Sequence, residues 1–301
     1  MAFTTPLTLT GPARSPRQML EDQSYGGHSS VHDDATADAL GLAGAPIEGP
    51  THFSQFDPLA FAVWGQAWFQ YGCISAHFRT MVVDGETVTA SLTTDGPSHT
   101  RIDAVKADGT PVLTGTASVG LDAPTELDAR LAAAHEREVD ELFIVDQLSI
   151  GDRSEAPVTT SIDRDTDNGP LYPFSLARKL DGITEPSAWY DSDANPWGRP
   201  VLPIEMISVL AEKTGTDFPV RRPCIGLFLD LQVRMLEGPL FVDEDYVLER
   251  EIVGLGQSRR TESFWVRTDL TDASTGTPAA SVLLHHGVFK DSYPGYPTDR
   301  L

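Results

Sequence analysis

A short pattern occurs twice in this sequence, and this repeat constrains the fold more than any other feature. Residues 44–47 read Gly-Ala-Pro-Ile and are followed by Ser54, and residues 198–201 read Gly-Arg-Pro-Val and are followed by Ser208. Further matches keep the same order in both halves while their spacing drifts, as insertions in loops would cause. We interpret the repeat as a tandem duplication of one domain. The alternative is that common turn motifs recur by chance.

The length of the chain fits this interpretation. A chain of 301 residues suits two domains of about 150 residues each, with enough apolar sequence to bury a core. Residues 151–168 are polar and charged and are typical of a loop or linker. We therefore place the boundary near Asp146, which gives an N-terminal domain over residues 1–145, with an extended N-terminal segment, and a C-terminal domain over residues 146–301.

A long helix is predicted early in each half. Asp57 and Pro58 suit the N-cap and first turn of a helix that ends at Gly72. Aromatic residues then follow at spacings of three or four, as on one face of a helix: Phe61, Trp64, Trp68 and Tyr71. In the second half, an apolar stripe begins after Pro203 and stops at Gly215. We expect both helices to be the buried spine of their domains.

Short β-prone runs follow each helix and are separated by Asp-Gly and similar turn signals. They cover residues 74–83, 87–93, 101–106 and 112–121 in the first half, and residues 227–236, 246–253, 263–270 and 279–290 in the second. A helix followed by an antiparallel meander, repeated once, predicts an α+β fold. Each sheet would wrap its helix, and the two sheets can join edge to edge. Residues 126–141 are predicted to form a connecting helix.

The charge excludes one class of partner. The formal net charge is −22, whereas proteins that bind nucleic acid rely on Lys and Arg to neutralise phosphates. We find no apolar run that suits a membrane helix and no secretion signal, so we expect no membrane partner and a cytoplasmic location. Cys73 and Cys224 occupy similar places in the two halves and are interpreted as buried packing residues. No cysteine spacing predicts a metal site, and no cofactor is predicted.

The densest group of titratable residues precedes the first helix. It includes His32, Asp34, Glu48 and His52. Histidine titrates near neutrality, and a neighbouring carboxylate can orient it and raise its basicity. These four residues are therefore the candidate acid–base catalysts. Taken singly, each also fits a surface group, a turn former or a helix cap.

Several motifs in this region resemble those of a known family. Residues 32–37 read His-Asp-Asp-Ala-Thr-Ala, Gly41 and Leu42 follow, and residues 46–49 read Pro-Ile-Glu-Gly. This pattern resembles the MaoC-like dehydratases and R-specific enoyl-CoA hydratases. The resemblance extends over residues 27–121 and, more faintly, the second half. It implies a tandem (double) hotdog fold, in which each half has a long central helix wrapped by an antiparallel β-sheet.

The catalytic signature of that family reads Asp-x-Asn-Pro-x-His, and this chain departs from it. The histidine is retained as His32, whereas Gly27, Ser29 and Ser30 stand at the aspartate, asparagine and proline positions. A carboxylate would have to come from elsewhere, such as Asp34 or Glu48. The second half has Trp197 where a histidine would be wanted, so we assign the chemistry to the first half and pocket shaping to the second.

The resemblance implies a hydro-lyase, a carbon–oxygen lyase that adds or removes water beside the carbonyl of an acyl thioester or similar activated carbonyl. Free N–H groups near Gly49 and Thr51 would stabilise the developing enolate, and His32 or His52 would move a proton at the neighbouring carbon. Further residues expected to contact the substrate are Trp64, Arg199 and Glu205. Whether the substrate is linked to coenzyme A, to an acyl carrier or to neither is left open, and a homodimer is allowed for.

Two other classes of function remain open at this point. A hotdog thioesterase would use a carboxylate, here Glu48 or Glu205, to activate water against the thioester carbonyl. A non-catalytic acyl-binding protein would need no acid–base pair. Ser-His-Asp hydrolysis is not expected because the sequence contains no Gly-x-Ser-x-Gly motif, and no glycine-rich phosphate loop is present.

Overall fold

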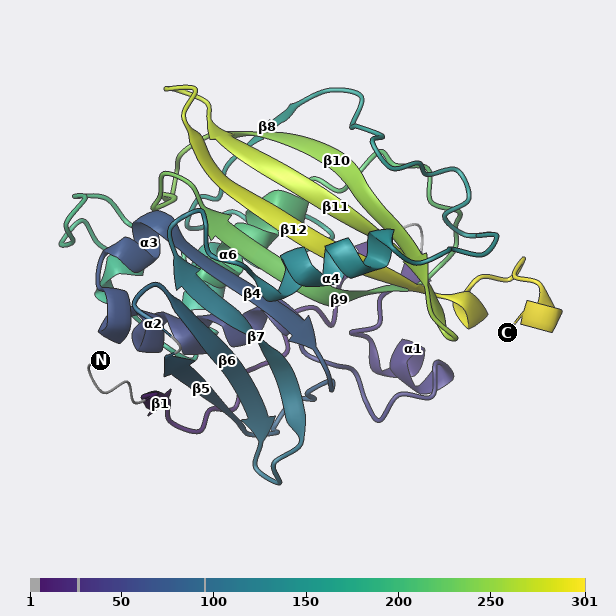
Figure 1. Cartoon of the computed structure of the whole chain (residues 1–301), viewed down its shortest axis with the longest axis horizontal. Coiled ribbons are helices and arrows are strands. Elements are labelled where there is room, and N and C mark those ends of the chain that lie inside the picture. Colours follow the sequence, from purple (N-terminus) through teal and green to yellow (C-terminus); the bar gives the residue numbers. More distant parts are fainter. Residues whose placement is uncertain (1–5, 26–27, 95, 301) are drawn as a thin grey trace.

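The computed structural model describes residues 6–25, 28–94 and 96–300. Within them, one large antiparallel sheet has the strand order β1-β5-β6-β7-β4-β9-β12-β11-β10-β8, and a small sheet pairs β2 with β3 (Figure 1). The large sheet consists of β1 (Thr8–Thr10), β4 (Gly72–Phe78), β5 (Val88–Thr94), β6 (His99–Lys106), β7 (Pro111–Val119), β8 (Val158–Thr160), β9 (Gly226–Met235), β10 (Tyr246–Gln257), β11 (Thr261–Asp272) and β12 (Pro278–Phe289). The small sheet consists of β2 (Ser24–Tyr25) and β3 (His28–Ser29).

The two halves have the same strand topology. The first half contributes the order β5-β6-β7-β4 and the second the order β10-β11-β12-β9, so each half is a meander whose first strand lies beside its last. All eight predicted strands are present, although β4 ends at Phe78 rather than at residue 83 and β10 extends to Gln257 rather than to residue 253. Equivalent backbone bonds also precede each helix: the Ile47 N–H donates to Val82 O at 2.8 Å, and the Leu202 N–H donates to Leu240 O at 2.8 Å. The duplicated architecture is therefore confirmed.

The halves join through antiparallel pairing of β4 with β9. The register runs from Cys73 opposite Arg234 to His77 opposite Asp230. This pairing uses the main-chain groups that would otherwise be exposed at two sheet edges. The predicted edge-to-edge junction is confirmed, and it makes a single continuous sheet from strands of both halves.

The helices divide between the two faces of this sheet. Alternate residues of β9 point to opposite faces. Leu231 and Val233 belong to the main core, which also contains Met206 and Ile207 of α6 (Ile204–Glu212). On the other face, Asp230 forms an ion pair with Arg130 of α4 (Glu126–His135). Figure 1 accordingly shows α6 behind the sheet and α4 across its front.

The helical region of the first half differs from the prediction of one long helix. It comprises the 3₁₀-helix η1 (Gly49–Phe56), α2 (Asp57–Trp64) and α3 (Ala67–Tyr71). Gly65, with φ at 58°, ends α2 and changes the direction of the chain. The aromatic stripe therefore does not stay on one face: Trp68 is buried, whereas Phe61 and Tyr71 are 39% and 44% exposed. The prediction of one buried aromatic face is corrected.

Several short elements escaped prediction. They are β1, β2 and β3, α1 (Asp34–Ala39), α5 (Leu176–Gly182), the 3₁₀ turns η2 (Ala188–Tyr190), η3 (Lys290–Ser292) and η4 (Thr298–Arg300), and β8 inside the expected linker. The connecting helix α4 is shorter than expected. From residue 6 onward the N-terminal segment is extended as expected, but Leu20 at its end is buried in the core. The domain boundary at residue 146 stays a prediction.

Two further expectations concern single features. Cys73 and Cys224 are both buried free thiols, as predicted for packing residues. In the described parts of the chain, we find no helix that combines the length and the apolar character needed to cross a membrane.

Gly115 offers a test of the central sheet. It lies on β7 between Ala76 of β4 and Ile102 of β6, and an added Cβ atom would lie 2.0 Å from the backbone oxygen of Ser75. We expect Gly115→Ala to lower the free energy of unfolding by about 3 kcal/mol, because backbone cannot move aside cheaply. Urea unfolding measures this change. Gly96→Ala, whose Cβ meets open space, should change stability by less than about 1 kcal/mol; equal effects would contradict the close approach of β4 to β7 at this position.

Candidate active site

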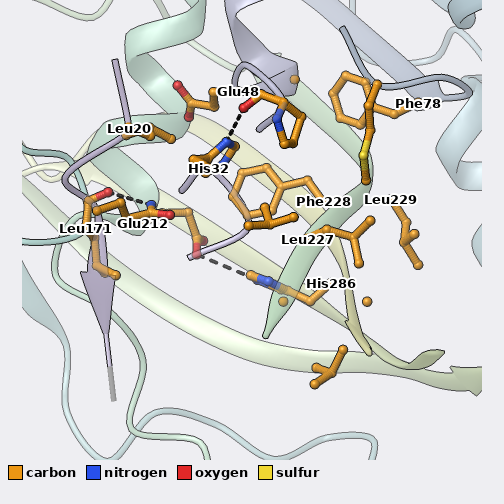
Figure 2. A pocket seen from close by; sticks show the side chains of 18 of the residues that line it. Leu20, His32, Glu48, Phe78, Leu171, Glu212, Leu227, Phe228, Leu229 and His286 are labelled. Atoms are coloured by element: carbon orange, nitrogen blue, oxygen red, sulfur yellow. Dashed lines mark hydrogen bonds and ion pairs between the residues drawn. The ribbon is translucent and has the colours of Figure 1, made fainter. Parts of the chain in front are cut away.

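A pocket of about 400 Å³ lies between the two halves, on the face of the sheet that carries α6. Its lining includes residues 46–49 and 78–82 of the first half, and residues 226–229 and 286–288 of the second. The walls are mostly aliphatic and aromatic. Figure 2 shows the polar side chains among them, with His32, Glu48, Glu212 and His286 reaching the pocket. An apolar cavity with a few polar groups is the usual form of a small-molecule site.

His32 lines this pocket and is held by a backbone contact. Its Nδ1 lies 2.6 Å from the carbonyl oxygen of Pro46. Because a carbonyl only accepts hydrogen bonds, Nδ1 carries the proton and Nε2 of the neutral ring is an acceptor. Burial lowers the pKa of His32, which the Pro46 contact only partly offsets. His32 therefore has the protonation state of a general base.

The carboxylate partner expected for His32 is replaced by this contact. Asp33 is the N-cap of α1 and accepts from the N–H of Thr36 at 2.8 Å. Asp34 follows in the first turn, faces solvent and accepts from the N–H of Ala45 at 3.3 Å. Both carboxylates are drawn into helix capping and loop contacts. His32 is thus oriented by the carbonyl oxygen of Pro46, while Asp33 and Asp34 bond elsewhere.

Glu48 lines the pocket at the N-cap position of η1 and is 6% exposed. Burial raises the pKa of its carboxyl group to about 7, although the nearby positive charge of Lys179 works in the opposite direction. Among the described residues, its Oε1 atom has no hydrogen-bond partner. Glu48 can therefore hold or release a proton near neutral pH and has a free oxygen for a ligand.

A buried ion cluster lies behind Glu48. The ammonium group of Lys179 on α5 is 2.8 Å from Glu205 Oε2 and 3.9 Å from Glu48 Oε2, and it donates to Thr51 Oγ1 at 3.0 Å. Ser54 donates to Glu205 Oε1 at 2.7 Å. Burial opposes the charge of Lys179, but the two glutamates outweigh it and raise the pKa of Lys179. Glu205 and Thr51 thus belong to this ion cluster and lie outside the pocket lining.

The start of η1 provides fewer free N–H groups than expected. Pro50 has none, and the N–H of Thr51 donates to Glu48 O at 3.2 Å within the 3₁₀ turn. This leaves Gly49, which lines the pocket. An added Cβ atom at Gly49 would lie 2.8 Å from the ring of Phe78. The absence of a side chain at Gly49 therefore lets the backbone approach that aromatic wall.

The remaining predicted residues fall into two groups. His52 is buried beside the pocket, with Nδ1 3.2 Å from Gln55 Oε1, and burial lowers its pKa to about 4. Trp64 and Arg199 lie outside the lining. Trp64 donates to Pro97 O at 2.8 Å, and Arg199 is exposed, with an ion pair to Glu244. The structure thus brings His32, Glu48, Gly49 and His52 together at the pocket. The other predicted residues lie outside its lining: Asp34, Thr51, Trp64, Arg199 and Glu205.

The polar residues of the second half that line the pocket and escaped prediction include Tyr172, Glu212 and His286. Burial raises the pKa of Glu212 to about 7 and lowers that of His286 to about 3. A signal existed in the sequence, because Glu212 ends an apolar helical stripe and His286 interrupts an apolar strand. The tertiary fold brings the end of α6 beside β12, where Glu212 Oε2 lies 3.7 Å from His286 Nε2, and the sequence pattern does not specify this proximity.

Comparison with known proteins shows which solved structures share this fold. A scan against protein-family models finds no match, and neither does a search of curated proteins. Among solved structures, the chain is similar to RV0216, a conserved hypothetical protein from Mycobacterium tuberculosis with a double hotdog fold, at a TM-score of 0.57 and 14% identity over 95% of this chain and 97% of that one. It is also similar to the dehydratase domain of PpsC from the same organism in complex with C12:1-CoA, at a TM-score of 0.50 and 12% identity over 94% of each chain.

A MaoC domain protein dehydratase from Chloroflexus aurantiacus J-10-fl is similar at a TM-score of 0.50 and 13% identity over 95% of each chain. The predicted double hotdog fold is confirmed by these likenesses, and the neighbours include MaoC-like dehydratases, as the motifs suggested.

The buried carboxyl group of Glu48 can be tested without a substrate. Its folded-state pKa of about 7 exceeds the ordinary value of 4.5, so the folded protein binds the proton more tightly than the unfolded chain. As pH rises from about 4.5 to about 7, wild type should therefore lose about 3 kcal/mol of stability relative to Glu48→Gln, and the difference should then stay constant.

Urea unfolding of both proteins at a series of pH values measures this difference. Glu237→Gln, which replaces an exposed glutamate outside the pocket, is the matched control. Parallel stability curves for wild type and Glu48→Gln would show that Glu48 titrates normally and would refute its assignment as a buried acid.

Proposed function

We propose that the protein is a hydro-lyase that removes water from, or adds water to, an acyl thioester or similar activated carbonyl compound. The observation that carries the proposal is one apolar pocket that is lined by neutral His32, with an accepting Nε2, by the buried carboxyl group of Glu48 and by Gly49. Base, acid and N–H donor are the groups that proton abstraction next to a carbonyl requires.

In the dehydration direction, the carbonyl oxygen lies at the Gly49 N–H, and protonated Glu48 donates a second hydrogen bond to it. Nε2 of His32 takes the proton from the α-carbon. The electron pair of that C–H bond forms the carbon–carbon double bond as the C–O bond at the β-carbon breaks. The hydroxyl group receives the proton that His32 took from the α-carbon and leaves as water, which returns His32 to its neutral form. Hydration is the reverse of these steps.

The pocket also supports the choice of substrate class. Its mostly apolar walls suit an acyl chain. Arg79 and Arg222 are exposed residues of the lining, and on a chain with a net charge of −22 they offer a local site for an anionic carrier. The structurally similar PpsC domain was solved in complex with C12:1-CoA. We therefore propose a substrate whose acyl group enters the pocket while a phosphate of its carrier stays near the two arginines.

The carboxylate-driven thioesterase is a weaker candidate for this pocket. Glu205, one of its two possible catalysts, is 1% exposed and bound to Lys179 and Ser54. Glu48 reaches the pocket, but burial favours its protonated form. A general base that activates water must be ionised, and a pKa of about 7 leaves Glu48 only partly ionised at neutral pH.

The reaction is tested with crotonyl-CoA, whose hydration removes the absorbance of its conjugated double bond. We expect hydration by wild type and a loss of at least about 100-fold in kcat/KM for His32→Ala, because general bases contribute about 10²–10⁴-fold. The double variant His32→Ala/His52→Ala should be equally inactive. His135→Ala, on the outer helix α4, should keep full activity because His135 is exposed and outside the pocket.

Release of free thiol in the same assay identifies a thioesterase. Thiol release that persists in the double histidine variant would replace the lyase by a carboxylate-driven hydrolase. Binding of the thioester without turnover, and with unchanged affinity in the double variant, would instead indicate a non-catalytic acyl-binding protein.

A further inference from the structure

Two carboxyl groups face the buried ammonium group of Lys179 at unequal distances. Glu205 Oε2 lies 2.8 Å from Lys179 Nζ, whereas Glu48 Oε2 lies 3.9 Å from the same nitrogen. The shorter separation is within hydrogen-bond distance and the longer one is not. Within the described ranges, neither glutamate forms an ion pair with any other residue. One cation is therefore shared unequally by two acids.

The surroundings of Glu205 favour its ionised form. The residue is 1% exposed, and Ser54 donates a hydrogen bond to its Oε1 atom at 2.7 Å. Glu205 also lies in the first turn of α6, where the helix dipole favours a negative charge. A cation, a hydrogen-bond donor and a helix N-terminus thus act together on this carboxylate. Its charge is held within the protein, because Glu205 does not line the pocket.

Glu48 has fewer partners and does line the pocket. Its side chain makes no capping bond to η1, and its Oε1 atom has no hydrogen-bond partner among the described residues. Burial is the main cause that raises its pKa to about 7. The charge of Lys179 opposes this change and the charge of Glu205 adds to it. The proton affinity of Glu48 therefore depends on both members of the neighbouring ion pair.

Other titratable side chains beside Glu48 carry no charge near neutral pH. His32, His52 and Tyr172 line the same pocket. Burial lowers the pKa values of the two histidines and raises that of Tyr172, so all three are neutral near pH 7. The charges that act on Glu48 thus come from Lys179 on α5 and Glu205 on α6.

The charge balance of this cluster decides where the proton lies. One ammonium group can balance one carboxylate. A second ionised carboxyl group would leave a net negative charge away from water, which costs free energy. Because Lys179 is bound to Glu205, the cluster is neutral when Glu48 keeps its proton.

We propose that Glu205 is a positioning residue for the reaction: it binds the ammonium group of Lys179 and thereby leaves Glu48 in the protonated form that donates a hydrogen bond to the substrate. The inference rests on the proposed function, in which Glu48 donates to the carbonyl oxygen. It assigns a role to a residue that does not line the pocket. Without the charge of Glu205, Lys179 would pair with Glu48 and favour its ionised form.

Infrared spectroscopy tests this inference without a substrate, because a protonated carboxyl group and a carboxylate absorb at different frequencies. The difference between wild type and Glu48→Gln isolates the band of Glu48. In wild type, the band of the protonated form should disappear with a midpoint near pH 7. In Glu205→Gln, measured against Glu205→Gln/Glu48→Gln, the midpoint should fall by at least about one pH unit, because an unopposed positive charge nearby favours ionisation.

Further variants show whether the effect acts through Lys179, each measured against the same variant with Glu48→Gln. Lys179→Met/Glu205→Gln removes both charges, so the midpoint should return to the wild-type value or rise above it. Glu205→Asp keeps the charge but withdraws it from Lys179, so it should give an intermediate midpoint, and it tests the inference even if Glu205→Gln does not fold. Glu237→Gln, at an exposed position outside the pocket, should keep the wild-type midpoint.

A kinetic measurement connects the titration to the reaction. In wild type, kcat/KM for hydration of crotonyl-CoA should decline as pH rises through the midpoint of Glu48, because the ionised group cannot donate a hydrogen bond. In Glu205→Gln, this decline should move to lower pH by the same amount as the infrared midpoint. A decline that stays in place would overturn the positioning role of Glu205.

The outcomes separate this inference from the proposed function. An unchanged infrared midpoint in Glu205→Gln or Glu205→Asp would overturn the inference, even if crotonyl-CoA is hydrated in a reaction that depends on His32. A lowered midpoint that persists after Lys179 is also replaced would overturn it as well, because the effect would not act through the lysine. The expected midpoints without any hydration by wild type would support the control of Glu48 by Glu205 and refute the dehydratase.

Discussion

The buried ammonium group of Lys179 is the interaction on which the arrangement of the site depends. It joins α5 to η1 of the first half and to α6 of the second, through Thr51 and Glu205. A charge this deep is tolerated only because its partners are close, and the loss of one partner would leave an uncompensated buried charge. Lys179 also lies 3.9 Å from Glu48, so the group that holds the halves together also acts on the charge of a pocket carboxyl group.

The pocket follows from the way in which the two halves meet. Pairing of β4 with β9 brings Phe78, at the end of one strand, beside the start of the other, while η1 and α6 pack together on the same face. Titratable groups from both halves then share one apolar space. Burial favours the neutral form of each group, raising the pKa values of Glu48 and Glu212 and lowering that of His32. A neutral base beside carboxyl groups that can hold a proton near neutral pH suits the proposed dehydration.

Much of the fold could be read from the sequence, because β-prone runs and turn residues are local signals that recur in both halves. His32, Glu48, Gly49 and His52, which line the pocket, could also be singled out from the sequence because they lie within one short segment. The pairing of His32 with Pro46 was missed because a backbone carbonyl leaves no side-chain signal. Glu212 and His286 were missed because α6 and β12 lie far apart in the sequence. The break at Gly65 depends on tertiary packing, which overrides the regular aromatic spacing.

The most direct test of the dehydratase proposal is a crystal structure with a bound butyryl thioester, which has the acyl chain of the substrate but no hydroxyl group to lose. The account predicts that the thioester oxygen lies within hydrogen-bond distance of the Gly49 N–H, and that Nε2 of His32 lies within about 3.5 Å of the α-carbon. A thioester bound elsewhere, or bound in the pocket with its α-carbon out of reach of His32, would contradict the proposed chemistry.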